Sequence, residues 1–229
     1  MTLELAVRLA EIILGFAIFQ QSLEFMRGQQ PEKALGISRA VLAILLMLGL
    51  QPLLVEAALL VTVVIMIRRF QGPYNGGSDT MTVLVLLCLC LSHVAPSRYW
   101  QEIALGYLAV QLTLSYFQSG WVKVVNPEWR SGRALQHVFA LSAYPVSENV
   151  RLWAGRPQVL LAMSWSVIVF ELLFPLALFN QTLLMVALGI AALFHLANAC
   201  LFGLNRFFWV WPAAFPVIMW FHVRLMSVF

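Results

Sequence analysis

Two ionisable side chains, Glu171 and His195, lie deep inside apolar stretches of the sequence. Glu171 stands nine residues before the Asn180-Gln181 dipeptide and His195 fourteen residues after it. If the dipeptide joins two antiparallel helices, the side chains differ in depth by about 7 Å, and Asn198 or a water molecule could bridge them. An ionisable group inside a bilayer costs roughly 2.5–3.5 kcal/mol. The pair therefore predicts either proton handling by histidine or a hydrogen-bonded link between helices.

A polar face lies on the helix expected over residues 99–125. Gln111, Ser115 and Gln118 follow the spacing i, i+4, i+7, which places them on one side of a helix. The face predicts either polar packing between helices or one wall of a ligand-binding groove.

A turn-rich segment, residues 71–79, precedes another apolar stretch. It contains the consecutive glycines Gly76 and Gly77 and ends with Ser78 and Asp79. Either of the last two residues could cap the following helix. Alternatively, the backbone N–H groups of the glycines and Asp79 could bind an anionic or carbonyl group of a ligand. The spacing and the lysine of a nucleotide-binding P-loop are absent.

Lys123 ends the helix expected over residues 99–125, where a lysine usually extends its ammonium group to the membrane surface. The sequence around it contains Tyr116, Phe117, Gly120, Trp129 and Gly132. Together with Lys123, these residues resemble a pattern of the HTTM (horizontally transferred transmembrane domain) family, which includes vitamin K-dependent gamma-carboxylases. The segments 170–175 and 202–204 and His195 look like further positions of this family.

The resemblance implies a membrane protein that works on or with a quinone or another isoprenoid lipid. In the carboxylases a lysine of this segment acts as the base toward reduced vitamin K, and Lys123 is the nearest match. With this implied role, Lys123, His195 and Glu171 are the candidate catalytic residues. Gln111, Ser115, Gln118, Asn198, Gly76, Gly77 and Asp79 are the candidate cofactor-binding residues.

The elements that carry these residues are expected to be membrane helices. Hydrophobic residues make up 62% of the chain and charged residues only 10%, and runs of about 20 apolar residues, enough to cross a bilayer, fill most of it. We expect an all-α bundle with helices over the ranges 3–26, 79–94, 99–125, 157–180, 181–202 and 207–223, together with the stretch 39–67.

The stretch 39–67 is too long for one upright span, since 29 residues rise about 43 Å, and Gln51-Pro52 lies at its centre. It predicts either one kinked helix or two helices joined at Gln51-Pro52. With two helices, eleven basic loop residues lie on one side of the membrane and three on the other. The positive-inside rule favours this arrangement, so we predict eight spans with both termini away from the cytoplasm.

The long connection 125–156 is expected to lie at the cytoplasmic membrane surface. The part 132–143 mixes Leu135, Val138 and Phe139 with Arg133 and His137, a pattern typical of a short interfacial helix. The whole chain, 1–229, is expected to form a single transmembrane domain.

Other features of the sequence narrow the functional classes. The 14 basic residues outnumber the acidic ones by four but form no dense patch, so we expect no nucleic-acid partner. Cys88, Cys90 and Cys200 lie in apolar runs and are interpreted as small packing residues, and no metal site is predicted. The N-terminus does not resemble a cleaved signal peptide, and we expect a bacterial cytoplasmic (inner) membrane.

Three functions are open at this stage. The first is an accessory or maturation subunit that works with a partner protein or an exported peptide, since the chain leaves little room for an extramembrane domain. The second is a membrane enzyme that binds a quinone or isoprenoid lipid and transfers a proton. The third is a small-molecule transporter, which the absence of repeats disfavours.

Overall fold

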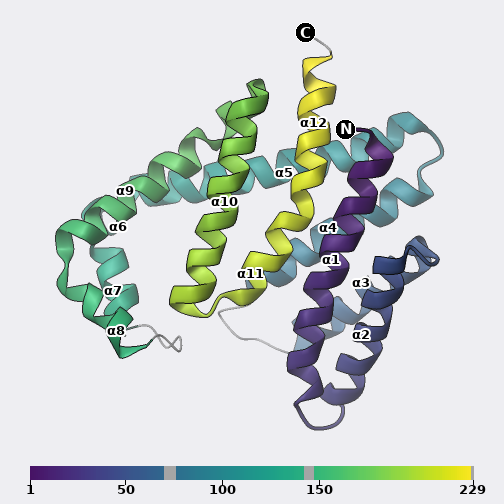
Figure 1. The fold of residues 1–229 in the computed structure, drawn as a ribbon, viewed down its shortest axis with the longest axis horizontal. Coiled ribbons are helices and arrows are strands. Elements are labelled where there is room, and N and C mark those ends of the chain that lie inside the picture. Colours follow the sequence, from purple (N-terminus) through teal and green to yellow (C-terminus); the bar gives the residue numbers. More distant parts are fainter. Residues whose placement is uncertain (70–75, 142–146, 228–229) are drawn as a thin grey trace. The chain divides into compact units, whose positions relative to one another are not determined.

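The structure is a computed structural model, and it describes residues 1–69, 76–141 and 147–227. Every element in these ranges is helical, which confirms the all-α prediction. The chain divides into two compact units (Figure 1). Unit 1 comprises residues 1–110 and 205–229, and unit 2 comprises residues 111–204. The expectation of a single transmembrane domain stays a prediction.

Unit 1 contains six α-helices and the first part of α5, among the residues that the structure describes. The six helices are α1 (Leu3–Met26), α2 (Glu32–Leu48), α3 (Pro52–Arg69), α4 (Gly76–Val94), α11 (Asn205–Val210) and α12 (Phe215–Met226). The helix α5 (Arg98–Val125) enters unit 2 at residue 111, and the 3-10 helix η3 (Trp211–Ala214) lies between α11 and α12. The helix α1 lies beside α2 and also contacts α12, and α3 packs on α4 (Figure 1).

Unit 2 contains the second part of α5 and the elements that follow it. These are α6 (Pro127–Arg130), α7 (Arg133–Leu141), α8 (Glu148–Arg151), η1 (Leu152–Gly155), α9 (Pro157–Leu173), η2 (Phe174–Phe179) and α10 (Gln181–Phe202). Leu135 and Phe139 of α7 form a buried cluster with Leu160 of α9 and Phe202 of α10. This cluster holds the connecting segment against the two long helices.

Local signals explain where several helices begin and end. Thr2 accepts a hydrogen bond from the Leu5 N–H at the start of α1, and Asn180 accepts one from the Leu183 N–H at the start of α10, as side chains at helix N-caps commonly do. Pro175 and Pro212 lack the N–H that an α-helix interior needs. Each lies where the α-helix gives way to a 3-10 segment, η2 and η3 respectively.

The expected helix boundaries agree closely with the structure at several places. The helices α1 and α10 have the expected ranges, and the stretch 39–67 is divided at residues 49–51 into α2 and α3. The break at Gln51-Pro52 is therefore confirmed, while the number of membrane crossings stays a prediction. The count of eleven basic loop residues includes Arg39, and this assignment is wrong, because α2 begins at Glu32 and Arg39 is fully buried.

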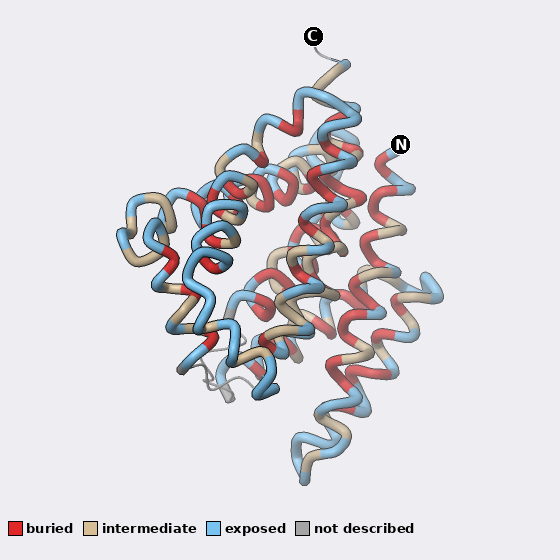
Figure 2. The backbone as a smooth tube through the Cα atoms, turned by 60° about the vertical axis from the view of Figure 1, so that its left-hand side comes forward, coloured by how far each residue is buried: buried red, intermediate tan, exposed pale blue. Residues whose placement is uncertain are grey.

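Much of the outer surface is apolar. Three helical stretches in the described ranges are long and apolar enough to cross a membrane, namely Gly77–Val94, Pro157–Phe179 and Gln181–Phe202. Along the helices, buried and exposed residues alternate (Figure 2), and leucines such as Leu54 and Leu193 are about two-thirds exposed. A surface of this kind is suited to contact with lipid or other apolar helices.

Candidate functional site

A buried ion pair joins α5 to α9 in unit 2. The Lys123 Nζ donates hydrogen bonds to both carboxylate oxygens of Glu171, at 2.8 and 2.6 Å. Only 16% of the Lys123 side chain and 3% of the Glu171 side chain are exposed. Because a buried carboxylate is costly without a partner, the lysine accounts for the position of Glu171 inside an apolar helix.

Gly120 permits the close approach of the two helices at this pair. A Cβ atom at Gly120 would lie 2.8 Å from the backbone nitrogen of Leu172 and 3.0 Å from the Cβ of Glu171. Gly120 precedes Lys123 by three residues, so both face the same side of α5. The absent side chain therefore brings the backbones together where Lys123 reaches Glu171.

A second polar contact lies further along the same face of α5. The Tyr116 hydroxyl lies 2.9 Å from His195 Nε2 on α10, and both side chains are buried. The rings of Phe170 and Phe174 pack against Tyr116, with centroids 5.9 and 4.3 Å from its own. Tyr116 and Lys123 thus tie α5 to α10 and to α9 respectively.

An apolar groove of about 600 Å³ has Lys123 and Asn198 in its wall. Most of its lining is apolar and comes from α7, α9 and α10, including Val138, Met163 and Val167. A groove of this size is within the range of small-molecule sites, which combine apolar walls with a few polar groups. Its polar groups include the ammonium group of Lys123 and the amide of Asn198.

The segment after α5 positions an aromatic ring beside the lysine. Lys123 Nζ lies 5.3 Å from the centre of the Trp129 ring, a distance at which a cation is attracted to the ring face. The Ser164 hydroxyl donates a 2.5 Å hydrogen bond to the Trp129 carbonyl oxygen. Gly132, with φ of +76°, lets the chain turn closely over Leu161 into α7, a conformation that favours glycine.

The structure brings some of the sequence-predicted site residues together. Lys123 and Glu171 form one pair, and Asn198 lines the same groove as Lys123. The hydrogen bond found for the His195 ring runs to Tyr116, and the partner of Glu171 is Lys123. These contacts differ from the expected bridge between Glu171 and His195, because both side chains meet residues of α5.

The polar face of α5 lies apart from this groove lining. Ser115 donates to the carbonyl oxygen of Leu112 in its own helix, while Gln111 is half-buried. Gln118 is exposed and lines a separate apolar groove with Phe117 and Trp121. Their predicted role in cofactor binding stays a prediction.

The other predicted binding residues, Gly76, Gly77 and Asp79, lie in unit 1. The helix α4 begins at Gly76, so Asp79 lies inside its first turn. A Cβ atom at Gly77 would approach the Phe207 ring to 2.8 Å. Asp79 accepts a 3.3 Å hydrogen bond from Gln21 Nε2. The predicted ligand-binding role of the three residues stays untested.

Asp79 belongs to a buried polar network around Arg39. Gln21 Oε1 accepts a 2.7 Å hydrogen bond from Arg39, which also donates to the Thr62 hydroxyl at 2.8 Å. The Gln21 amide therefore connects the guanidinium of Arg39 to the carboxylate of Asp79. This network holds α1, α2, α3 and α4 of unit 1 together through buried polar contacts.

Sequence reasoning missed a cluster in unit 1 that contains Glu11, Glu56 and His93. Glu56 and His93 lie in apolar stretches just as Glu171 and His195 do. The same cost of burying an ionisable group would have singled them out. Their grouping was not predictable, because the three residues come from three helices.

The site residues of unit 2 lie inside a region that matches a known protein family. A model of the HTTM domain matches residues 92–222, which is more than half of the chain and includes Tyr116, Lys123, Glu171 and His195. Comparisons with curated proteins and with solved structures give no match. With its three apolar helices of membrane-spanning length, the chain is an integral membrane protein, and it belongs to the HTTM family.

Proposed function

We propose that the protein binds a quinone or another isoprenoid lipid in the groove beside Lys123 and transfers a proton on that ligand. The observation that carries the proposal is the position of Lys123, paired with Glu171, in the wall of a mostly apolar groove of about 600 Å³. An isoprenoid quinone has the complementary form, a polar ring on an apolar chain. The HTTM resemblance supports the same class of ligand.

The ion pair provides a route for one proton. In an apolar surrounding, an ion pair loses much of the hydration that stabilises it in water. A proton can then move from the Lys123 ammonium to the Glu171 carboxylate, which leaves a neutral amine. That amine accepts a proton from the hydroxyl of a bound quinol, giving a quinolate and an ammonium group. Asn198 can donate a hydrogen bond to an oxygen of the ring.

Ligand binding is tested first by extracting lipids from the purified protein and identifying them by mass spectrometry. A short-chain naphthoquinone is then titrated into protein in nanodiscs, with the quenching of tryptophan fluorescence, to which Trp129 in the groove wall contributes, as the signal. Val167→Phe fills the groove and should weaken binding about tenfold, a change of about 1.4 kcal/mol. Val169→Phe is the matched control, because Val169 lies on the same helix and lines a different groove.

Proton transfer is tested separately with the reduced naphthoquinone under anaerobic conditions. Binding to the wild-type protein should shift the absorption spectrum toward that of the quinolate, and Lys123→Met should abolish the shift while retaining the ligand. Equal quinone affinity in Val167→Phe and Val169→Phe would contradict ligand binding in the groove beside Lys123. A quinolate spectrum that persists in Lys123→Met would contradict the role of the lysine.

A second candidate, the accessory or maturation subunit, is favoured by a separate apolar groove on unit 2. This groove of about 820 Å³ is lined by α9, η2 and α10, and it includes the small residues Ala162, Ala177 and Ala187. Small residues allow close packing of membrane helices. We propose that, in this case, a helix of a partner protein packs there.

Site-specific photo-crosslinking in cells distinguishes the partner hypothesis. A photoreactive amino acid at Val186, which lines the groove of about 820 Å³, should capture one protein species. The same amino acid at Leu193, which is 66% exposed on the same helix and does not line that groove, should capture lipid. Lipid capture alone at both positions would count against the accessory role.

A further inference from the structure

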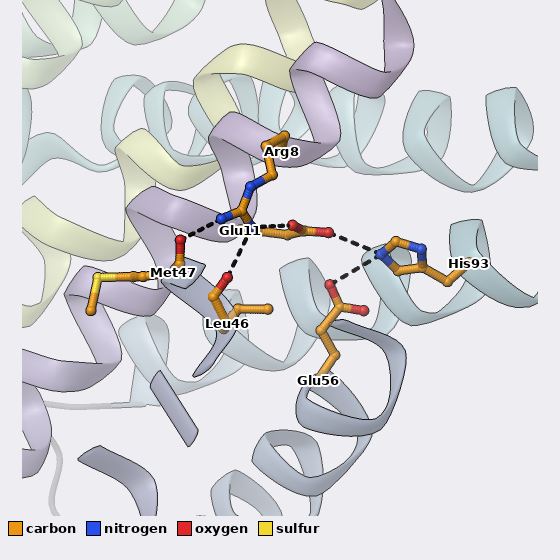
Figure 3. Close-up of polar contacts among 6 residues, drawn as sticks. All are labelled: Arg8, Glu11, Leu46, Met47, Glu56 and His93. Atoms are coloured by element: carbon orange, nitrogen blue, oxygen red, sulfur yellow. Dashed lines mark hydrogen bonds and ion pairs between the residues drawn. The ribbon is translucent and has the colours of Figure 1, made fainter. Parts of the chain in front are cut away.

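Three side chains with metal-ligating atoms converge in unit 1 from three helices: Glu11 of α1, Glu56 of α3 and His93 of α4 (Figure 3). His93 Nε2 lies 2.9 Å from Glu11 Oε1 and 3.6 Å from Glu56 Oε1. The three ligand atoms all lie within 4.8 Å of one another. This convergence is independent of the groove and the ion pair in unit 2.

The environment of Glu56 favours a bound cation. Its side chain is fully buried, and neither carboxylate oxygen forms a hydrogen bond of standard geometry among the described residues. Its polar neighbours include the Cys90 thiol and the His93 ring, whose Nε2 lies 3.6 Å from Glu56 Oε1. A buried carboxylate is normally hydrogen-bonded, paired or bound to a metal. Glu56 points toward Glu11 and His93 (Figure 3), so a second carboxylate increases the negative charge there.

The separations suit ligands of one ion. Nitrogen and oxygen ligands lie about 2.0–2.2 Å from Zn²⁺, so two ligands of the same ion are about 2.9–3.5 Å apart at octahedral to tetrahedral angles. The distances of 2.9 and 3.6 Å from His93 Nε2 lie close to this range, and the carboxylates of Glu11 and Glu56 lie within 4.8 Å of each other. One imidazole and two carboxylates form a mixed ligand set that first-row divalent metals accept.

Hydrogen bonds from Arg8 orient Glu11, and a cavity gives access to the cluster. Arg8 donates a 2.7 Å hydrogen bond to Glu11 Oε2, and it also donates to the carbonyl oxygens of Leu46 and Met47 (Figure 3). The other oxygen, Oε1, is thereby left toward His93. A cavity of about 520 Å³ is lined by Arg8, Glu11 and His93. Metal sites commonly have such second contacts to their ligands.

We propose that Glu11, Glu56 and His93 bind one divalent first-row transition-metal ion and thereby link α1, α3 and α4. The ion takes the place of the direct contacts from His93 Nε2 to the two carboxylates. Its charge compensates both carboxylates, including the fully buried one of Glu56. Glu11 and Glu56 precede the region that the HTTM model matches, residues 92–222, and His93 lies inside it.

Metal content of the purified full chain is the direct test. The protein is stripped with a chelator, exposed to Zn²⁺, Mn²⁺ or Co²⁺ in turn, dialysed, and measured by elemental mass spectrometry. Wild-type protein should retain about one ion per chain of at least one of these metals. Retention of none by wild-type protein would overturn the proposal, whatever the variants do.

Matched variants locate the ion. Glu56→Gln and His93→Gln should lose the retained metal, and Arg8→Gln should weaken its affinity by about tenfold. Glu102→Gln is the control, because Glu102 pairs with Arg224 elsewhere in unit 1 and should retain the ion. With Co²⁺, the visible absorption bands of a nitrogen-containing site should disappear in His93→Gln. Equal Co²⁺ retention and unchanged bands in that variant would overturn the assignment.

Discussion

Individual charged residues inside apolar helices are satisfied by partners from distant parts of the sequence. Lys123 and Glu171 are 48 residues apart, and Arg39 and Thr62 are 23 residues apart, yet each pair meets in the fold. The free-energy cost of burying a charge depends on whether a partner compensates it. Removing one partner should therefore have a larger effect than a substitution on the surface.

Glu171→Gln removes the negative charge that compensates Lys123. Because breaking a buried pair typically costs about 3–5 kcal/mol, we expect a clear fall in the thermal unfolding temperature in detergent. Glu128→Gln is the control, because its pair with Arg133 is largely exposed and such pairs contribute about 0–1 kcal/mol. Similar unfolding temperatures for the two variants would show that the Lys123–Glu171 pair contributes no more to stability than the exposed Glu128–Arg133 pair.

Tyr116→Phe removes only the hydroxyl that contacts His195 Nε2 at 2.9 Å. The aromatic packing with Phe170 and Phe174 is retained, so we expect a loss of about 1–3 kcal/mol from the buried hydrogen bond alone. The change in thermal unfolding temperature measures this loss of stability. Tyr107→Phe, at a position that is 56% exposed, should change stability little. An equal effect of both substitutions would show that the buried contact contributes nothing specific.

At the scale of elements, glycine positions decide how closely two helices of unit 2 pack. Gly120 lies against α9, whereas a Cβ atom at Gly189 in α10 would have no neighbour within 4 Å. The two positions are both inside helices, so alanine has a similar effect on intrinsic helix propensity at each. Their surroundings alone distinguish them.

Gly120→Ala should destabilise the protein and separate Lys123 from Glu171, because its Cβ would meet the backbone of α9 at 2.8 Å. Gly189→Ala should be neutral or stabilise the protein by up to about 1 kcal/mol. Thermal unfolding of both variants and quinone titration of Gly120→Ala provide the measurements. If Gly120→Ala were as stable as Gly189→Ala, this result would contradict the close packing of α5 and α9 at Gly120.

At the scale of the whole molecule, the arrangement of the helices in a membrane is the main expectation to test. Arg39 is buried in α2, so it no longer counts as a basic loop residue. Ten of the eleven basic residues assigned to the cytoplasmic side remain, against three on the other side. The predicted orientation is therefore unchanged.

Single cysteines placed in a chain without Cys88, Cys90 and Cys200 can report this orientation. With eight spans, Gln51→Cys and Ser97→Cys should react with an impermeant thiol reagent from outside the cell. Glu148→Cys should react only after the membrane is permeabilised, because residues 125–156 are predicted to be cytoplasmic. Labelling of Glu148→Cys in intact cells, or protection of Gln51→Cys, would contradict the eight-span arrangement.

The sequence by itself determined the class of the fold and most helix boundaries. Apolar length, the caps Thr2 and Asn180, and the break at Gln51-Pro52 are local properties, which act through hydrogen bonds and φ preferences of neighbouring residues. The motif residues Tyr116, Gly120 and Lys123 were likewise recognisable as a family pattern. Their partners were not, since spacing along the chain carries no information on which helices become neighbours.

Only the tertiary structure decided which polar groups meet. It paired Lys123 with Glu171 and Tyr116 with His195, where the sequence suggested a bridge between Glu171 and His195. It also brought Glu11, Glu56 and His93 together from three helices, although no metal-ligand spacing is present in the sequence. The physical reason is that a buried charge needs a partner within a few ångströms, and helix packing, rather than sequence separation, sets that distance.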